Sequence, residues 1–445
     1  MKRRKLLITL SMAFVFLLSS LHVRAVDVVQ VPADQISTVY NQRIDSDKME
    51  GWPKGPQIYS EAGIVMDMDS GAILYAKNID NPHYPASITK ILTALVALEH
   101  NELTQTVTVT PEDYNFLEKG DNHIGLKNKE QITMEDALHG TLLASGNEVA
   151  HAVASNTEGG YDHFIEMMNE KCDALGCTNS NFTNSHGLHD DEHYTSARDM
   201  ALIASAAFQN EEFRRITSTL QYTIPETNVT NETRTFQNHH KMLFDWRDQY
   251  YEYCVGGKTG YTRQALNTLV TFASKDGVNL VAVVLRTHGT GNVYVDTKAM
   301  LDYAYGNFSK VSVTLDTVEA EGLKAIEENS YVMLPVGVSF EQLDCRVETP
   351  MELGDKTGKA VYTYGGHPVG EFETTITDKY YNKLHGIKEP VKEEKPKEES
   401  SSDFSTVLKL LIVVVLVIVV LFAIILGIII YRRELNRKRR SRKIR

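Results

Sequence analysis

An apolar stretch near the C-terminus constrains this chain more than any other feature. Residues 407–430 are apolar apart from Lys409, and about twenty such residues cross the hydrocarbon core of a bilayer as a helix. A helix of that length in a soluble domain would be amphipathic, whereas this stretch carries apolar residues all round. We therefore predict a transmembrane helix at residues 404–431 and a basic tail at residues 432–445.

The N-terminus carries an apolar segment of a different kind. Basic residues at positions 2–5 precede an apolar run at residues 6–21, and a small residue, Ala25, stands where cleavage is expected. This layout is typical of a secretory signal peptide, predicted at residues 1–25, with an uncleaved anchor as the alternative. The positive-inside rule then keeps the basic tail in the cytoplasm and the body of the chain outside, in a single-pass arrangement.

The charge of the exported part argues against a nucleic-acid partner. The formal net charge of −12 includes five positive charges within residues 1–25 and a net nine in Lys409 and the tail, so the part between them carries −26. A body this acidic repels polyanions. The basic tail follows a membrane span directly, which favours contact with anionic lipid over nucleic acid.

Composition divides the exported part into four pieces. Residues 26–57 are polar and carry no strong periodicity, so we predict a leader there. Residues 58–309 hold the three motifs described below, in order. Residues 310–387 show short alternating segments separated by turn residues, which predicts a small β domain. Residues 388–403 are rich in Lys, Glu, Pro and Ser, which predicts a solvated linker.

Three short motifs occur in order: S-x-x-K at Ser87 and Lys90, S-x-N at Ser145 and Asn147, and K-T-G at residues 258–260. A serine hydroxyl needs an adjacent base to act as a nucleophile, and lysine becomes that base when burial or a nearby cation lowers its pKa. Each motif alone is common by chance. Together they predict a serine acyl-transfer site.

The surroundings of the first two motifs fit this chemistry. Residues 87–98 are mostly apolar, which predicts a buried helix with Ser87 in its first turn and Lys90 on the same face. Ser145 and Asn147 flank a glycine between two helical patterns. That break predicts a tight loop in which the serine passes protons and the asparagine amide holds a substrate backbone.

The K-T-G motif occurs twice. The copy at residues 258–260 precedes two strand-like runs, at residues 268–273 and 280–285, whereas residues 356–358 follow Gly354 and Asp355 and resemble a charged hairpin turn. Motif order and strand context favour Lys258 over Lys356.

The sequence implies no metal and no cofactor. Its histidines lack zinc-protease spacing such as H-E-x-x-H. The cysteines, Cys172, Cys177, Cys254 and Cys345, allow three disulfide pairings, and free thiols are equally consistent with the sequence.

Residues 62–305 resemble the serine D-alanyl-D-alanine carboxypeptidases, which are low-molecular-mass penicillin-binding proteins. The resemblance rests on the three motifs and on their contexts at residues 85–95, 184–188 and 194–201. It implies an α+β fold: a β-lactamase/transpeptidase-like domain with an antiparallel sheet, helices and a helical subdomain. Residues 310–387 resemble the small all-β domain that follows in many members. The location implied is a bacterial cell membrane.

The resemblance also implies roles for individual residues. Ser87 attacks the bond between the terminal D-alanines of a peptidoglycan stem peptide, Lys90 takes its proton, and Ser145 relays a proton to the leaving D-alanine. Asn147 orients the substrate, and Lys258 with Thr259 binds the terminal carboxylate. The backbone N–H groups of Ser87 and Tyr261, beside Gly260, form an oxyanion hole. β-Lactam antibiotics would acylate Ser87 as covalent inhibitors.

One departure from the family pattern concerns the substrate carboxylate. Some members place an arginine after the last core strand, but residues 289–294 contain none. Arg286 is a candidate substitute, and an ordinary strand-end arginine is the other interpretation.

Other functions could use the same residues. A D,D-endopeptidase or transpeptidase would act on a cross-link or a second strand. A class A β-lactamase would need a glutamate loop for deacylation, and the sequence between Asn147 and Lys258 offers no convincing one. A catalytically inert wall-binding or sensing module would lack the nucleophile or the base, and this chain retains both.

Overall fold

The computed structural model describes residues 36–289, 291–314, 322–326, 328–348, 356–387 and 402–441, without the side chains of 402–406 and 435–441. The predicted signal peptide lies outside the described residues, as does most of the predicted linker. The described residues up to Asp378 form one compact unit, and the described residues from Lys379 onward form a second.

The centre of the first unit is an antiparallel five-stranded sheet with the order β2-β1-β9-β8-β7. Its strands are β1 (Ser60–Asp67), β2 (Ile73–Lys77), β7 (Cys254–Thr262), β8 (Leu266–Lys275) and β9 (Val278–Thr287). Strands β1 and β2 pair as an antiparallel hairpin. The third motif lies in β7, an edge strand, so one side of its backbone is free of sheet pairing.

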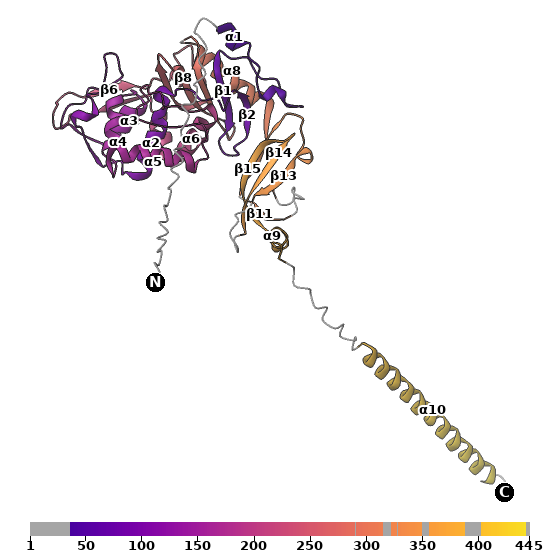
Figure 1. The fold of residues 1–445 in the computed structure, drawn as a ribbon. Helices are drawn as coiled ribbons and strands as arrows, with labels where there is room; N and C mark the ends of the chain where they lie inside the picture. The colour runs from indigo at the N-terminus through magenta and orange to yellow at the C-terminus, as the bar shows by residue number, and fades with distance from the viewer. Residues whose placement is uncertain are drawn as a thin grey trace, which may run out of the picture. The chain divides into compact units, whose positions relative to one another are not determined.

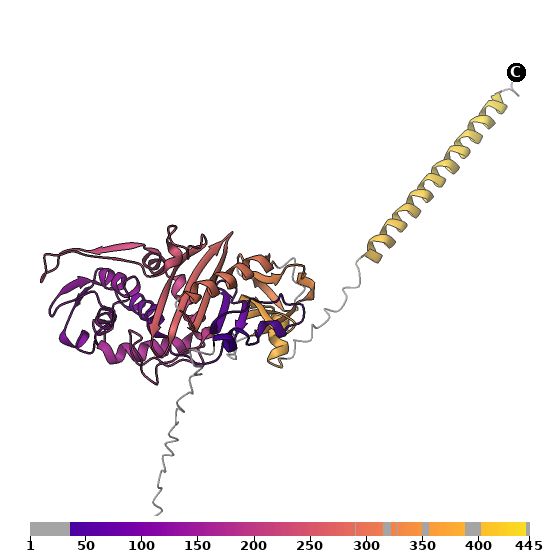
Figure 2. The ribbon, with the colours of Figure 1, turned by 90° about the horizontal axis from the view of Figure 1, so that it is seen from above.

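Both faces of this sheet are buried by helices. Alternate residues of β9 point to opposite faces: Val281, Val283 and Leu285 join the core under the helical subdomain. Ala282 and Val284 join the core under the helix at residues 292–307. Figures 1 and 2 show the subdomain helices gathered on one side of the sheet. Those helices are α2 (Lys90–His100), α3 (Met134–Leu142), α4 (Asn147–Ser155), α5 (Gly160–Ala174), α6 (Ala197–Gln209) and α7 (Glu211–Ser218).

Local capping determines where several of these helices begin. The Thr133 side chain accepts a hydrogen bond from the Asp136 backbone N–H and forms a capping box at the start of α3. Ser196 caps α6 through the Asp199 N–H in the same way. Two short ribbons extend the subdomain: β3 (Thr106–Thr108) with β4 (Gln131–Thr133), and β5 (Gln221–Ile224) with β6 (Arg234–Gln237).

The opposite face is covered by α8 (Asn292–Asn307), which leads directly into the β-rich region. The first small sheet pairs β10 (Phe308–Ser312) with β12 (Tyr331–Pro335). The second has the order β11-β15-β14-β13 and consists of β11 (Leu323–Ile326), β13 (Asp344–Glu348), β14 (Thr357–Tyr364) and β15 (His367–Ile376). The predicted all-β region is therefore present, and the expected boundary between residues 309 and 310 lies inside β10.

The β-rich region is bonded to the turn between β1 and β2. The Tyr331 hydroxyl donates to the buried Asp67 carboxylate at 2.9 Å, and the Glu371 backbone N–H donates to the Ser70 carbonyl. Burial raises the pKa of Asp67, and the hydrogen bonds from Ser70 and Tyr331 oppose that rise. These contacts explain why the two regions form one compact unit.

The described part of the expected leader packs onto the sheet. It contains α1 (Ile36–Tyr40) and a 3₁₀ turn, η2 (Ser46–Lys48). The buried Trp52 donates its indole N–H to the Leu74 carbonyl, and the buried Lys77 ammonium donates to the Val39 carbonyl at 2.8 Å. A few buried side chains hold this polar segment against the sheet. This packing could not be predicted from the sequence, because the segment has no strong periodicity.

The second unit contains α9 (Asp378–Leu384) and α10 (Ser402–Ser441). Within α10, Val407–Glu434 is the one described segment long and apolar enough to cross a membrane. This helix fits a membrane anchor. It continues beyond the predicted end at residue 431 into the basic run, because lysine, arginine and glutamate are good helix formers.

Candidate active site

Ser87 lies in a tight turn that leads into the helix α2. The sequence predicted one regular helix, but residues Ala86–Thr89 form a 3₁₀ turn, η3, and the α-helix begins at Lys90. Ala86 has φ +53°, outside the α region, so a regular helix cannot include it. In a 3₁₀ turn the side chains at i and i+3 eclipse each other, which brings Ser87 and Lys90 together.

The Lys90 amine has three polar neighbours. Its Nζ lies 3.1 Å from Ser87 Oγ, 2.7 Å from Asn147 Oδ1 and 2.5 Å from the His186 carbonyl oxygen. Neutral lysine has two N–H donors and one lone pair. Since an amide oxygen and a carbonyl can only accept, the two N–H groups go to them and the lone pair faces the Ser87 hydroxyl.

The environment favours this neutral form. Lys90 is fully buried, and burial, followed by the charge on Lys258, lowers its pKa well below the ordinary lysine value. Ser87 itself is only partly buried. A reachable hydroxyl therefore stands beside a buried amine that can accept its proton.

A second serine–lysine pair faces the first. Ser145 lies between α3 and α4 with φ +59°, and its Oγ accepts a hydrogen bond from Lys258 Nζ at 2.9 Å. Lys258 also donates to the Thr259 carbonyl, and burial lowers its pKa to about 7. Asn147 opens α4, and its backbone N–H donates to the Asn122 carbonyl.

The strand β7 packs closely against the Ser87 turn because residue 260 is glycine. A Cβ at Gly260 would lie 3.0 Å from the Ser87 backbone nitrogen and 2.3 Å from Thr268 Oγ1. The Thr268 hydroxyl donates to the Pro85 carbonyl at 2.8 Å. The third motif and its neighbouring strand thus hold the Ser87 turn from one side.

Gly187 supports the same turn from the other side. Its φ is +83°, and a Cβ there would lie 2.0 Å from the Ala86 carbonyl oxygen. Only glycine allows the segment after His186 to approach this closely. The segment at residues 184–188, noted in the sequence for its family context, therefore positions both the Lys90 acceptor and the Ser87 turn.

These elements enclose a cavity of about 390 Å³. Six predicted residues line it, and Lys90 and Lys258 lie behind them, bonded to the two serines. The six are Ser87, Ser145, Asn147, Thr259, Gly260 and Tyr261. Sequence reasoning did not assign the other lining side chains, among them Asp121, Asn122, Leu188, His239, Lys241, Asn267, Thr268, Val293 and Tyr294. They come from loops, a short 3₁₀ turn, the start of β8 and the first turn of the helix at residues 292–307, and only tertiary structure brings them together.

Two residues left open by the sequence lie elsewhere. Arg286 donates from Nε to the buried Glu61 carboxylate at 2.8 Å and is not among the residues that line the cavity. Lys356 pairs with Asp378, and Thr357 and Gly358 open strand β14. The second K-T-G copy was expected in a hairpin turn, and that expectation is wrong, because sheet pairing with β15 begins at Thr357.

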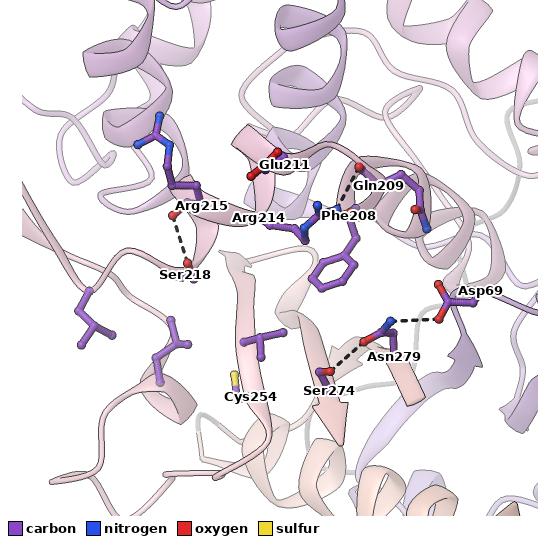
Figure 3. A pocket seen from close by; sticks show the side chains of 13 residues that line it. Asp69, Phe208, Gln209, Glu211, Arg214, Arg215, Ser218, Cys254, Ser274 and Asn279 are labelled. Atoms are coloured by element: carbon purple, nitrogen blue, oxygen red, sulfur yellow. Dashed lines mark hydrogen bonds between the residues drawn. The ribbon is translucent and has the colours of Figure 1, made fainter. Parts of the chain in front are cut away.

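A larger cavity, of about 820 Å³, lies at the other end of β7 (Figure 3). The hydroxyls of its two serines are hydrogen-bonded to groups other than lysine. Ser218 donates to the Arg215 carbonyl, and Ser274 donates to the Asn279 side chain. Burial raises the pKa of the Cys254 thiol there to about 12, which disfavours the nucleophilic thiolate. The residues that line this cavity therefore do not form an acyl-transfer site.

Comparison with known proteins decides the family. The D-alanyl-D-alanine carboxypeptidase family model matches residues 49–289, more than half of the chain. The chain belongs to the D-alanyl-D-alanine carboxypeptidase family. One relative is the D-alanyl-D-alanine carboxypeptidase DacA of Haemophilus influenzae, 29% identical over 73% of this chain and 86% of the relative. DacF of Bacillus subtilis is 26% identical over 70% of this chain and 83% of the relative.

Solved structures of penicillin-binding and transpeptidase proteins share the fold of this chain. Penicillin-binding protein 5 of Haemophilus influenzae aligns with a TM-score of 0.59 at 27% identity, covering 73% of this chain and 98% of that protein. The Streptomyces K15 DD-transpeptidase aligns with a TM-score of 0.53 at 28% identity, covering 57% of this chain and 100% of that one. The predicted fold class and the predicted serine carboxypeptidase activity are confirmed.

Replacing Gly187 with alanine should lower the rate of acylation by penicillin, because the added Cβ would displace the Ala86 carbonyl and with it the Ser87 hydroxyl. We expect a loss on the order of a hundredfold, the scale of a misplacement of about 1 Å. Gly176→Ala is the matched control, since Gly176 has φ +79° and open space around it. Stopped-flow acylation by a fluorescent penicillin measures both, and equal losses in the two variants would contradict the argument.

Proposed function

We propose that Ser87 is the nucleophile with which this carboxypeptidase removes the terminal D-alanine from peptidoglycan stem pentapeptides, and that Lys90 is its base. The observation that carries the proposal is the geometry of the Lys90 amine. Two acceptors, Asn147 Oδ1 and the His186 carbonyl, occupy its N–H groups, and Ser87 Oγ lies 3.1 Å away. A lone pair held toward a hydroxyl is what proton abstraction needs.

Acylation then follows from these groups. Ser87 Oγ attacks the carbonyl carbon between the two D-alanines while its proton passes to Lys90 Nζ. The negative charge on the carbonyl oxygen is met by the backbone N–H groups of Ser87 and Tyr261. The close approach of Gly260 to the Ser87 nitrogen supports this oxyanion hole, because it brings the β7 backbone beside that N–H.

The second serine–lysine pair serves the leaving group. As the tetrahedral intermediate collapses, the C–N bond breaks, the Ser145 hydroxyl gives its proton to the departing amine, and Lys258 replaces it through the 2.9 Å contact. A pKa of about 7 suits Lys258 to give and regain a proton near neutral pH. Lys90 loses the proton that it took from Ser87 and Lys258 regains one, both by exchange with solvent, so Lys90 is neutral again. Water then attacks the ester carbonyl of Ser87 and gives a proton to Lys90, and Lys90 returns that proton to Ser87 Oγ as the ester C–O bond breaks and the shortened peptide leaves.

Substrate binding uses the edge of β7. An extended peptide can add to an exposed strand edge, and Thr259, Gly260 and Tyr261 line the cavity there. The Asn147 Oδ1 is bonded to Lys90, which leaves its amide N–H groups for the substrate backbone. β-Lactams present a strained carbonyl in the same place and would acylate Ser87.

The remaining parts of the chain have architectural roles in this proposal. Residues 58–309 carry the catalysis, residues 310–387 form the β domain, and residues 388–403 link it to the membrane. We propose that α10 crosses a bacterial cell membrane once, with the catalytic domain outside and the tail inside. The cluster of arginines and lysines after residue 431 supports that orientation.

Ser87→Ala should abolish covalent labelling by a fluorescent penicillin and the release of D-alanine from a stem pentapeptide. Ser218→Ala, which removes a hydroxyl outside the active-site cavity, should leave both intact. Mass analysis of the wild-type products separates the alternatives, since a carboxypeptidase yields tetrapeptide and free D-alanine, whereas an endopeptidase requires a cross-linked substrate. Labelling of Ser87→Ala would sink the assignment.

The pH dependence of acylation should report the perturbed Lys90. Because neutral Lys90 is the active form and its pKa is lowered, the rate should rise with pH and level off well below the ordinary lysine value of about 10.4. The second-order rate of penicillin acylation between pH 5 and 10.5 measures this. A rate that still climbs about tenfold per pH unit near pH 10 would contradict a depressed pKa.

The orientation of α10 is testable in whole cells. An epitope fused after Arg445 should resist external protease in intact cells and become sensitive once the membrane is permeabilised. The catalytic domain should be digested in both cases. Loss of the epitope from intact cells would reverse the proposed topology.

A further inference from the structure

The substrate proposed above ends in a carboxylate, and a carboxylate that enters a partly desolvated cavity needs a cation or several donors. The inference that follows rests on that proposed function. It concerns which side chain supplies the cation, because the two basic residues suggested by the sequence are both engaged elsewhere.

Arg286 is held by a buried acid. Its Nε donates to Glu61 Oε1 at 2.8 Å, and the same oxygen lies 2.9 Å from His288 Nε2. Arg286 also donates to the Gln264 carbonyl in the turn between β7 and β8. The guanidinium therefore braces the sheet end, and breaking its contact with Glu61 would leave a buried carboxylate without its cation.

Lys258 is also a poor carboxylate ligand. Its Nζ points at Ser145 and at the Thr259 carbonyl, and it is not among the residues that line the cavity. With a pKa of about 7, a large share of this amine is neutral at physiological pH. These properties suit proton transfer to Ser145, and they give little fixed charge for binding.

Lys241 meets the requirement. It belongs to the short turn η5 (Lys241–Leu243), is exposed, and lines the Ser87 cavity together with Thr259 and Tyr294. Its Nζ lies 5.7 Å from the centre of the Tyr294 ring, in the first turn of α8. Among the described residues, no carboxylate lies within ion-pair distance of this ammonium group (4.0 Å).

The other charged or titratable groups of the cavity do not replace it. His239 lines the cavity, but histidine is mostly neutral at pH 7.5, and desolvation followed by the Lys258 charge lowers its pKa further. Asp121 is the acid among the lining residues, and it would repel a carboxylate. Lys241 is thus the one lysine or arginine among the lining residues of the Ser87 cavity.

We propose that Lys241 is the specificity-determining cation of this enzyme, and that it binds the free C-terminal carboxylate of the substrate beside the Thr259 hydroxyl. Tyr294 holds the lysine over the cavity through its ring face, an interaction that leaves the ammonium N–H donors free. The side chain would select peptides with a free C-terminus over peptides whose terminus is blocked.

The test compares two substrates that differ in one charge. They are a diacetyl-L-lysyl-D-alanyl-D-alanine peptide and the same peptide with a C-terminal amide. Release of D-alanine or of D-alaninamide by the detergent-solubilised full chain gives kcat/KM for each. We expect Lys241→Gln to lower kcat/KM for the free acid between tenfold and a hundredfold, the scale of a charged hydrogen bond, and to change that for the amide less than about threefold. Lys241→Arg should keep most of the preference.

Two control variants make the result specific. Lys275→Gln removes a lysine that also lies over tyrosine rings, 4.6 Å from Tyr253 and 5.6 Å from Tyr305, away from the cavity. Arg263→Gln removes a cation from the cavity that adjoins the Ser87 site. Neither should alter the ratio of acid to amide.

Three outcomes would overturn the inference: equal losses for acid and amide in Lys241→Gln, no loss for either, or a loss of acid preference in Arg263→Gln instead. A failure of the proposed function looks different. In that case the wild-type chain would release no D-alanine, or Ser87→Ala would retain activity, whatever residue stands at position 241.

Discussion

The candidate active site depends on two buried lysine amines, those of Lys90 and Lys258, which lie directly behind the serines that line the cavity. Placing an ammonium ion in a protein interior costs several kcal/mol unless it is paired. Within the described part of the chain, neither Lys90 nor Lys258 has a carboxylate as a hydrogen-bond partner. Carbonyl, amide and hydroxyl oxygens surround them instead. These acceptors satisfy the N–H groups without stabilising the charge as an acid would, so the neutral form is favoured. Neutral Lys90 can accept a proton, and Lys258, with a pKa of about 7, can give and regain one near neutral pH.

The surrounding elements of the domain hold the two lysine amines close to their serines. Two glycines allow the backbone to close around the Ser87 turn: Gly260 on β7 and Gly187 on the segment after His186. A methyl group at either position would push against backbone or against Thr268. The sheet supports the arrangement because β7 is bonded to β8 along its length, while Thr217 on α7 holds its start through Gly257.

Backbone strain is present at or beside both serines of the cavity, and it also occurs at other described residues such as Leu266 and Arg286. Ala86 and Ser145 both have positive φ, at +53° and +59°, a conformation that costs a non-glycine residue about 1–3 kcal/mol. Each lies beside or at one of the two serines. The helices α2 and α4 that follow these residues are well packed, and their packing offsets the cost of the strained conformations. The two serines are therefore held on rigid elements.

The sequence was a better guide to which residues meet at the cavity than to the conformation of the backbone around them. The short spacing within the motifs predicted that Ser87 lies beside Lys90, and the structure brings this pair together with Ser145 and Asn147 at one cavity. Motif order distinguished Lys258 from Lys356, whereas strand context did not, because Thr357 and Gly358 also open a strand. The 3₁₀ turn at Ser87 was missed because the apolar pattern of residues 87–98 is the same for either helix type. The packing of residues 36–57 depends on single anchors such as Trp52, which leave no periodic signal.

Lys241 shows most clearly which functional residues sequence motifs cannot predict. It stands in a polar segment without a motif, and nothing near it in sequence marks it as functional. Its importance arises only when η5, β7 and the start of α8 meet around one cavity, and when Arg286 and Lys258 are found to be engaged by Glu61 and Ser145. A motif records residues that chemistry fixes at short spacing, whereas a binding cation can be supplied from any element whose side chain reaches the cavity. Residues of that second kind become visible only by accounting for every charge in the folded site.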